Sequence, residues 1–206
     1  MRTAILILAG GEGARIGGRK ADKLLAGSRL IDLTLQATQN WNLPTAIQLA
    51  YKDQVKLDGV PQVIDTPHID GPLAGLIAGL KWAQKKQFEA LLTLPCDCPF
   101  LPSDLYTNLR QATANTPHVA IASSKGRLHP VCALWQPHHL KILEANAATG
   151  KLSLTRSAIE CGHIEVEWKT EPTNSSAESP PNIDPFFNIN TEQDLAQAEA
   201  YLASRG

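Results

Sequence analysis

Short apolar runs alternate with helical segments along most of the chain, and this order limits the fold more than any other feature. Thr3–Leu8 and Ala90–Leu94 are largely apolar, as strands buried on both faces of a sheet are. Pro72–Gln87 repeats apolar residues at helical spacing and begins with proline, which the first turn of a helix tolerates. Strands that alternate with helices are typical of an α/β domain with a parallel sheet. We expect further strands at Thr45–Ala50, Gln62–Ile64, His118–Ser123, His129–Trp135 and Ile164–Trp168, and further helices at Ser28–Asn40, Ser103–Ala114, Pro137–Ala148, Leu152–Ile159 and from Thr191 onward.

The length of the chain fits one domain. Its 206 residues suffice for one buried core, and no internal repeat divides them. We therefore predict an α/β fold: a single Rossmann-like three-layer domain over residues 1–206, with a mostly parallel central sheet. Residues 170–185 are rich in proline, serine and asparagine, which indicates a flexible surface loop. Thr191 and Asp194 have the spacing of a capping box at the start of the last helix.

Charge and apolar content argue against several classes of protein. The net charge of −1 is unlike that of a general nucleic-acid binder, which carries a basic face. The first apolar run, Ala4–Ala9, is shorter than the core of a signal peptide, and no run approaches the ~20 apolar residues of a membrane span. Four cysteines are too few for a disulfide framework. We expect a cytoplasmic protein that binds neither nucleic acid nor membranes and keeps reduced thiols at Cys96, Cys98, Cys132 and Cys161.

A glycine-rich stretch follows the first expected strand. Residues 5–25, ILILAGGEGARIGGRKADKLL, contain five glycines and four basic side chains. Glycine adopts turns that other residues cannot make and lets the backbone approach a ligand closely. The basic side chains beside it indicate that this ligand is an anion.

Three interpretations of the glycine-rich stretch involve a phosphate ligand. A Walker A loop requires Ser or Thr after its lysine, and neither follows Gly18. A dinucleotide-binding loop turns directly into a helix, whereas Gly17 and Gly18 extend the loop here. The third is an open loop that wraps a nucleoside triphosphate, with Arg15 and Lys23 facing its phosphates during attack on the α-phosphate. A glycine-rich turn with solvated basic side chains is the alternative without a ligand.

Two aspartates are expected at the same edge of the sheet as the glycine-rich stretch. Asp65 follows the third expected strand and Asp97 follows the fourth. In open α/β sheets, ligands bind beyond the carboxyl ends of the strands, so these groups should converge on one rim. Asp97 is then the natural ligand for Mg²⁺ on a triphosphate. The alternatives are a helix cap at Asp97 and an ordinary turn residue at Asp65.

Several motifs together resemble the MobA family of molybdenum cofactor guanylyltransferases. They are LAGGEGARIGG…DK, DGPLAGLIAGL, LPCDCPFLP, HPVCALW and FFNINTEQDL, in order from Ile5 to Leu195. The resemblance implies that GMP is transferred from GTP to the phosphate of molybdenum-bound molybdopterin, with release of pyrophosphate. It implies a nucleotide-binding N-terminal half and a C-terminal half that binds mainly molybdopterin. It also implies Mg²⁺ as the cofactor.

The same resemblance implies roles for individual residues. Asp97 would hold Mg²⁺, Lys23 would contact the phosphates, and the segment from Gly71 to Gly75 would line the guanine. Asn188 and Asn190 match the NxNT motif near the pterin. His129 is expected to contact substrate and not to act as a base, because a phosphate nucleophile is already ionised near neutral pH. The implied nucleotide contacts are Leu8, Ala9, Gly10, Gly11, Gly13, Lys23, Asp65, Gly71, Gly75 and Asp97.

The chain departs from the family pattern at two places. Arg19-Lys20-Ala21 intervenes between the paired glycines and Asp22-Lys23, which makes Lys20 a rival to Lys23 as the phosphate contact. The second expected strand ends in Leu49-Ala50, where family members often carry an asparagine that contacts the nucleotide.

Other functions remain open at this stage. A CTP-dependent molybdopterin cytidylyltransferase, a sugar-phosphate nucleotidyltransferase and a non-catalytic nucleotide-binding module are the alternatives. Relatives that use CTP tend to show LAAG where this chain has Leu8-Ala9-Gly10-Gly11, which favours GTP. We expect a monomer or weak oligomer that transiently contacts proteins of molybdenum cofactor delivery.

Overall fold

A seven-stranded sheet forms the middle layer of the molecule. The computed structural model describes residues 1–11, 13–169 and 183–204. The sheet order is β5-β4-β1-β6-β8-β7-β9. Among the strands of this sheet, β8 runs against its neighbours β6 and β7, and the remaining neighbours pair in parallel. The strands are β1 Thr3–Leu8, β4 Thr45–Leu49, β5 Gln62–Ile64, β6 Ala90–Pro95, β7 Val119–Ser124, β8 Arg127–Trp135 and β9 His163–Glu167.

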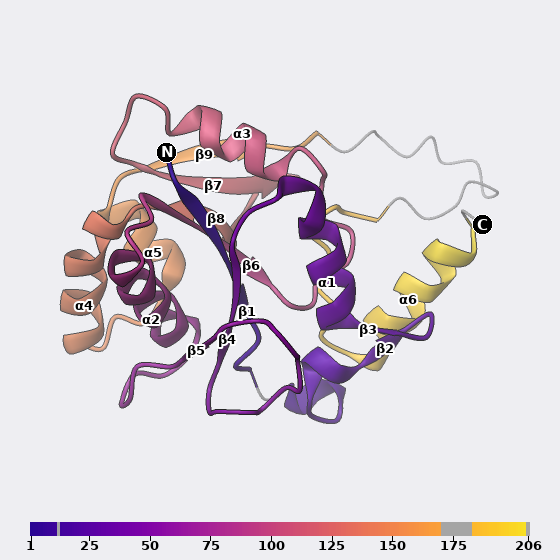
Figure 1. Cartoon of the computed structure of the whole chain (residues 1–206). Coiled ribbons are helices and arrows are strands. Elements are labelled where there is room, and N and C mark those ends of the chain that lie inside the picture. The colour runs from indigo at the N-terminus through magenta and orange to yellow at the C-terminus, as the bar shows by residue number, and fades with distance from the viewer. Residues whose placement is uncertain (12, 170–182, 205–206) are drawn as a thin grey trace.

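Helices cover both faces of this sheet. Successive strand residues point to opposite faces, so Leu6 packs into one core while Ile5 and Ile7 pack into the other. The first core includes residues of α2, α4 and α5, which gather on one side of the sheet in Figure 1. The second core includes residues of α1 and α3. The helices are α1 Leu30–Thr38, α2 Pro72–Lys85, α3 Leu105–Ala112, α4 Leu140–Ala148, α5 Leu154–Glu160 and α6 Glu192–Ala203.

A small third core joins the glycine-rich stretch to the C-terminal helix. Ile16 and Leu25 pack there with Leu30, Ile189 and Ala198. The helix expected from Ser28 begins only at Leu30, because a two-stranded hairpin precedes it. This hairpin pairs β2 (Leu24–Leu25) with β3 (Ser28–Arg29) through a turn at two residues with positive φ. It orients Leu25 and the start of α1 toward the same core.

The remaining expected elements are confirmed, with small shifts at their ends. α5 is capped by Ser153, whose hydroxyl accepts a hydrogen bond from the Arg156 N–H. The capping box is present as well: Thr191 Oγ1 accepts from the Asp194 N–H at 3.1 Å, and Asp194 Oδ2 accepts from the Thr191 N–H at 2.8 Å. Most of the expected flexible loop, residues 170–182, lies outside the described residues. No helix in the described part of the chain is long and apolar enough to cross a membrane.

Candidate functional site

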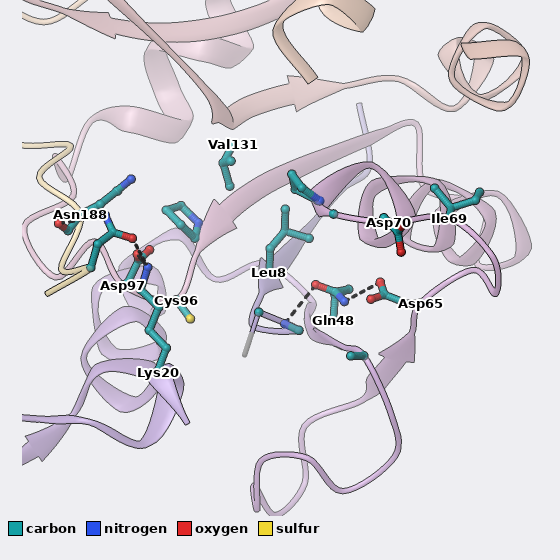
Figure 2. A pocket seen from close by; sticks show the side chains of 17 residues that line it. Leu8, Lys20, Gln48, Asp65, Ile69, Asp70, Cys96, Asp97, Val131 and Asn188 are labelled. Carbon is teal, nitrogen blue, oxygen red and sulfur yellow. Dashed lines mark hydrogen bonds and ion pairs between the residues drawn. The ribbon is translucent and has the colours of Figure 1, made fainter. Parts of the chain in front are cut away.

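A pocket of about 600 Å³ opens at the carboxyl ends of β1, β4, β5 and β6. It brings together the glycine-rich stretch, Asp65 and Asp97, as the order of the strands predicts. The N-terminus of α2, strand β8 and the segment before α6 complete its wall (Figure 2). The lining residues are Leu8, Gly10, Gly11, Lys20, Gln48, Ala50, Asp65, Ile69, Asp70, Gly71, Pro72, Pro95, Cys96, Asp97, Val131, Asn188 and Asn190.

One end of the pocket holds a nearly buried ion pair. Asp97 follows β6, is only 5% exposed and pairs with the Lys20 ammonium. Lys20 Nζ also donates a hydrogen bond of 2.6 Å to Asn190 Oδ1. Burial raises the pKa of the Asp97 carboxyl above its ordinary value, and the charge of Lys20 opposes that shift. Helix α3 begins at Leu105, so Asp97 does not cap it.

The backbone of the glycine-rich stretch places Lys20 in the pocket. Lys20 opens a 3₁₀ turn, Lys20–Asp22, whose middle residue, Ala21, is anchored in the core. Gly13 has a φ of +64°, and a Cβ there would lie 2.6 Å from Lys20 Cβ. Glycine is required at residue 13 both for its backbone conformation and for room. Gly13 is not among the lining residues, so it supports Lys20 and does not itself face the pocket.

Two predicted phosphate contacts lie outside the pocket lining. Lys23 Nζ is 3.6 Å from Glu192 Oε1, an ion pair in which Glu192 is largely exposed. Arg15 is exposed on the 3₁₀ turn Ala14–Ile16. Of the two rival lysines, Lys20 is therefore the one that the structure places beside Asp97.

Gln48 on β4 also lines the pocket, and the sequence analysis did not single it out. It is 4% exposed, and its Nε2 donates to Asp65 Oδ1 at 2.6 Å. Burial raises the pKa of the Asp65 carboxyl, and the hydrogen bond from Gln48 opposes the shift. Leu49, where the family asparagine was expected, is 1% exposed and packs in the core. A glutamine inside an apolar strand is the signal that could have identified this residue.

Ala9, Gly10 and Gly75, which were also predicted to contact the nucleotide, all lie against Gln48. Ala9 is buried in the core, and its N–H donates to the Gln48 carbonyl. A Cβ on Gly75 would lie 2.7 Å from Gln48 Cδ, and one on Gly10 would overlap Gln48 Nε2. Gly75 thus lies against Gln48 and outside the pocket lining, whereas Gly10 both lines the pocket and makes room for that side chain. Gly71, with a φ of +73°, lines the pocket before α2.

A second pocket of about 480 Å³ adjoins the first, with Asn188 and Asn190 in both linings. In it, Ser124 Oγ donates to the Asp184 carboxylate at 2.7 Å and lies 2.7 Å from His129 Nε2. His129 stacks on Phe186 with ring centroids 4.6 Å apart. Burial lowers the pKa of His129, while the charge of Asp184 opposes that shift. The lining residues are Ser124, Lys125, Arg127, His129, Asp184, Phe186, Phe187, Asn188, Asn190 and Asp194.

The cysteines near the first pocket form no disulfide and no metal cluster. All four cysteines are free. Cys96 lines the pocket, but burial raises the pKa of its thiol to about 12, which keeps it protonated and unreactive at neutral pH. Across the described residues, no three His, Cys, Asp or Glu side chains gather as a metal-binding group. A metal ion at Asp97 would therefore take its remaining ligands from water, other protein oxygens or the substrate.

The model of the MobA-like NTP transferase domain matches residues 5–163, which include most of the first pocket. The chain belongs to the MobA-like NTP transferase family. It is 34% identical to a molybdenum cofactor guanylyltransferase of Cereibacter sphaeroides, over 98% of both chains. It is 37% identical to a protein of the same name from Rhodopseudomonas palustris, over 97% of this chain and 92% of the relative.

A solved structure confirms the nucleotidyltransferase fold of this MobA-like protein. Molybdopterin-guanine dinucleotide biosynthesis protein A from Archaeoglobus fulgidus superposes with a TM-score of 0.74 at 23% identity. The superposition covers 98% of this chain and 100% of the other. The family model ends at residue 163, so Asp184, Asn188 and Asn190 lie beyond it, whereas the curated relative and the superposed structure each cover 98% of the chain. The family resemblance and the expected fold are confirmed.

Proposed function

We propose that this protein transfers GMP from GTP to the phosphate of molybdenum-bound molybdopterin, forming molybdopterin guanine dinucleotide and pyrophosphate. The observation that carries the proposal is the first pocket: a cation and a carboxylate at one end, and a polar pair at the other. Full-length relatives named molybdenum cofactor guanylyltransferase support the choice of substrates. The second pocket, which shares two asparagines with the first, supports a reaction between two bound substrates.

The end of the pocket at Asp97 suits the triphosphate and Mg²⁺. Asp97 is 5% exposed and faces an ammonium, so its environment accepts positive charge. Mg²⁺ in proteins is held by one or two carboxylates together with substrate phosphates, and Asp97 can supply the carboxylate. When bound, Mg²⁺ would neutralise negative charge on the triphosphate. Lys20 would then turn from Asp97 to the phosphates, beside the backbone of Gly10 and Gly11.

The reaction itself requires positioning and charge stabilisation more than acid–base chemistry. A phosphate oxygen of the pterin substrate attacks the α-phosphorus of GTP, and the bond from that phosphorus to the bridging oxygen of pyrophosphate breaks. Lys20 stabilises the negative charge that the leaving group gathers. The attacking phosphate is already ionised, so no residue has to remove a proton from it. His129 accordingly has no role as a base.

The second pocket is the proposed site of the pterin substrate. Lys125 and Arg127 line it with positive charge, which suits an anionic molecule. Phe187, which is partly exposed, offers aromatic surface to a flat ring, whereas Phe186 is 3% exposed and is covered by His129. Asn188 and Asn190 lie between the two pockets, where the phosphate of the pterin would approach GTP. Contact with proteins of cofactor delivery and a weakly associating or monomeric state remain predictions.

Pyrophosphate release measured with each of the four nucleoside triphosphates tests this function. We expect release with GTP, only when molybdopterin and Mg²⁺ are both present. Release with CTP in place of GTP would instead identify a molybdopterin cytidylyltransferase. Release with a sugar phosphate as acceptor, and none with molybdopterin, would identify the sugar-phosphate alternative. Binding of GTP without release under any of these conditions would leave a nucleotide-binding module and contradict the proposal.

A further inference from the structure

Gln48 occupies an unusual place for an amide side chain. It lies on β4 between Ile47 and Leu49, which are both 1% exposed, and it is itself 4% exposed. A buried amide is costly unless its polar atoms are hydrogen-bonded. Figure 2 shows the side chain reaching into the pocket, with bonds to the glycine-rich stretch on one side and to Asp65 on the other. The amide is therefore part of the pocket and not of the core.

Two motif glycines make the room that Gln48 occupies. A Cβ on Gly75 would lie 2.7–2.8 Å from three atoms of the Gln48 side chain, and a Cβ on Gly10 would overlap its amide nitrogen. Neither glycine has the positive φ that L side chains rarely adopt. Both positions therefore need glycine because of space and not because of backbone conformation. The slot that they form fits an unbranched side chain at residue 48.

Hydrogen-bond partners fix the orientation of the amide. The Gly10 N–H can only donate, so the Gln48 atom 3.4 Å from it is Oε1. The Asp65 carboxylate can only accept when ionised, so the atom 2.6 Å from it is Nε2. Gln54 Nε2 donates to the Gly10 carbonyl at 3.2 Å, which holds the backbone of Gly10 from its other side. Gln48 and Asp65 thus form one oriented unit.

This unit presents a donor beside an acceptor. Nε2 of Gln48 keeps a second hydrogen, and the Asp65 carboxylate keeps a second oxygen. The pairing edge of guanine carries the acceptor O6 beside two donors, N1–H and the 2-amino group. Adenine and cytosine carry a ring-nitrogen acceptor beside a single amino donor, so neither can give the carboxylate two hydrogen bonds. Burial raises the pKa of Asp65. The hydrogen bond from Gln48 opposes that shift and favours the ionised carboxylate, which is the form that accepts hydrogen bonds.

The unit also lies at the appropriate end of the pocket. In Figure 2, Lys20 and Asp97 are on one side and Asp65 is on the other, with Leu8 between them. A nucleotide whose phosphates lie at Lys20 places its base toward Asp65. We propose that Gln48 is a positioning residue that orients Asp65 and its own amide toward the guanine of GTP, so that the pair determines nucleotide specificity. The inference rests on the proposed use of GTP.

Calorimetric affinities for GTP, inosine triphosphate and 2′-deoxy-GTP test the proposal. Guanine can give two hydrogen bonds to the Asp65 carboxylate: N1–H to the oxygen that also accepts from Gln48, and the 2-amino group to the second oxygen. Inosine triphosphate differs from GTP only by lacking the 2-amino group, so it keeps the N1–H bond and leaves the second oxygen unpaired. We expect the wild-type protein to bind GTP about tenfold or more tightly than inosine triphosphate, as expected for a site built to accept a hydrogen bond. Gln48→Met keeps the length of the side chain and removes its hydrogen bonds. In this variant the preference should fall to about twofold or less.

Two further variants separate positioning from a general loss of structure. Gly75→Ala removes no polar group, but its Cβ would displace the Gln48 side chain. It should therefore also lower the preference for GTP over inosine triphosphate. Alanine is favoured over glycine inside α2, which keeps this variant folded. Gln62→Met makes the same change on the neighbouring strand β5, outside both pockets, and should keep the wild-type preference. Melting temperatures are recorded for all variants.

Three results would overturn the proposal. One is a wild-type preference for GTP over inosine triphosphate that persists in Gln48→Met and Gly75→Ala. Another is a Gln48→Met variant that loses its preference for GTP over 2′-deoxy-GTP but keeps its preference over inosine triphosphate. This result would indicate that Asp65 contacts the sugar and not the base. The third is a wild-type protein that does not distinguish GTP from inosine triphosphate. None of these results contradicts the proposed function, which is tested separately by pyrophosphate release from GTP in the presence of molybdopterin. Release from CTP in place of GTP would contradict the proposed function itself.

Discussion

At the residue scale, the pair of Asp97 and Lys20 accounts for most of the chemistry that the first pocket can perform. A carboxylate that is 5% exposed is stable when a positive charge faces it, and Lys20 supplies that charge in the protein alone. A metal ion on a triphosphate can take the place of the ammonium. Lys20 then becomes available to the phosphates, so the two residues exchange partners when the nucleotide binds.

Asp97→Asn should remove most of the turnover. The amide keeps an oxygen but loses the negative charge that hard Mg²⁺ favours, so we expect a loss of about a hundredfold or more. Affinity for GTP measured without metal should change little, and the gain in affinity on adding Mg²⁺ should shrink. Isothermal titrations with and without Mg²⁺ measure both quantities. Wild-type turnover in this variant would exclude the metal role.

Lys20→Ala and Lys23→Ala should differ clearly. Lys20 lies at Asp97 inside the pocket, so its removal should lower GTP affinity by about tenfold or more, a free-energy change of about 1.4 kcal/mol. Lys23 pairs with the largely exposed Glu192, and its removal should change affinity by less than about threefold. A larger loss for Lys23→Ala would show that the bound nucleotide rearranges the glycine-rich stretch.

At the element scale, the glycine-rich stretch positions the Lys20 side chain in addition to offering backbone groups to phosphate. Its two 3₁₀ turns place Ile16 and Ala21 in separate cores, and these anchors set the path of the backbone between them. The Ile16 N–H and the Gly18 N–H both donate to the Gly13 carbonyl at 2.9 Å. The loop is therefore closed on itself before any ligand arrives.

Gly13→Ala and Gly17→Ala form a matched pair. Both glycines have positive φ, so both substitutions carry a similar backbone cost of about 1–2 kcal/mol. At residue 13 the new Cβ also meets Lys20 Cβ, whereas at residue 17 it meets only the flexible end of Lys23 at 3.3 Å. We expect a loss of GTP affinity in Gly13→Ala that exceeds that in Gly17→Ala, measured by calorimetry. Equal affinities would contradict the supporting role of Gly13.

The entrance to α4 contains a buried histidine that should make stability sensitive to acid. The His139 ring is neutral: Nδ1 accepts from the Gln136 N–H at 3.1 Å, and Nε2 donates to the Pro117 carbonyl at 2.7 Å. Burial lowers the pKa of His139 from 6.5 to about 4. Between these values the unfolded chain binds a proton that the folded chain does not. The contribution is complete above pH 6.5 and lost as the pH falls toward 4.

Acid unfolding measures this contribution of His139. The free energy of unfolding should fall by about 3 kcal/mol between pH 6.5 and 4 on account of this residue. His139→Asn removes the titrating ring and should flatten the dependence over this range. His68→Asn, at an exposed position, should leave the slope largely unchanged. A slope in His139→Asn equal to that of the wild-type protein would contradict the assignment.

At the scale of the whole molecule, the C-terminal segment joins the two pockets. The Ile189 N–H donates to the Asp97 carbonyl at 3.0 Å, and Ile189 packs in the core below α6. Asn188 and Asn190, on either side of it, line both pockets. Because β8 runs against its neighbours, Arg127 at its start and Val131 within it reach the same edge of the sheet as the ends of β1 and β6.

Arg127→Ala should affect the binding of molybdopterin but not the binding of GTP. Arg127 lines the second pocket and not the first, so its loss should raise the KM for molybdopterin by about tenfold and leave GTP affinity unchanged. Arg110→Ala, at an exposed position of α3 outside both pockets, should change neither quantity. Steady-state kinetics with each substrate varied in turn measure the effect. A change in GTP affinity alone would contradict the division of the site.

The sequence by itself determined the secondary structure, the helix cap and the edge of the sheet at which the site lies. Apolar spacing predicts the strands and helices, Thr191 and Asp194 predict the capping box, and the strand order predicts that Asp65 and Asp97 meet at one rim. Each of these follows from backbone periodicity or from the direction of a parallel strand, which a short stretch of sequence already specifies.

Tertiary packing alone decided which side chains occupy that rim. Lys20 and Lys23 are three residues apart in one loop, and Lys20 enters the pocket because Ala21 is buried and Asn190, far along the chain, receives its ammonium. Gln48 reaches Asp65 only because glycines from two other segments, residues 10 and 75, leave it room. Such choices depend on the space between segments that are distant in sequence, and no local pattern specifies that space.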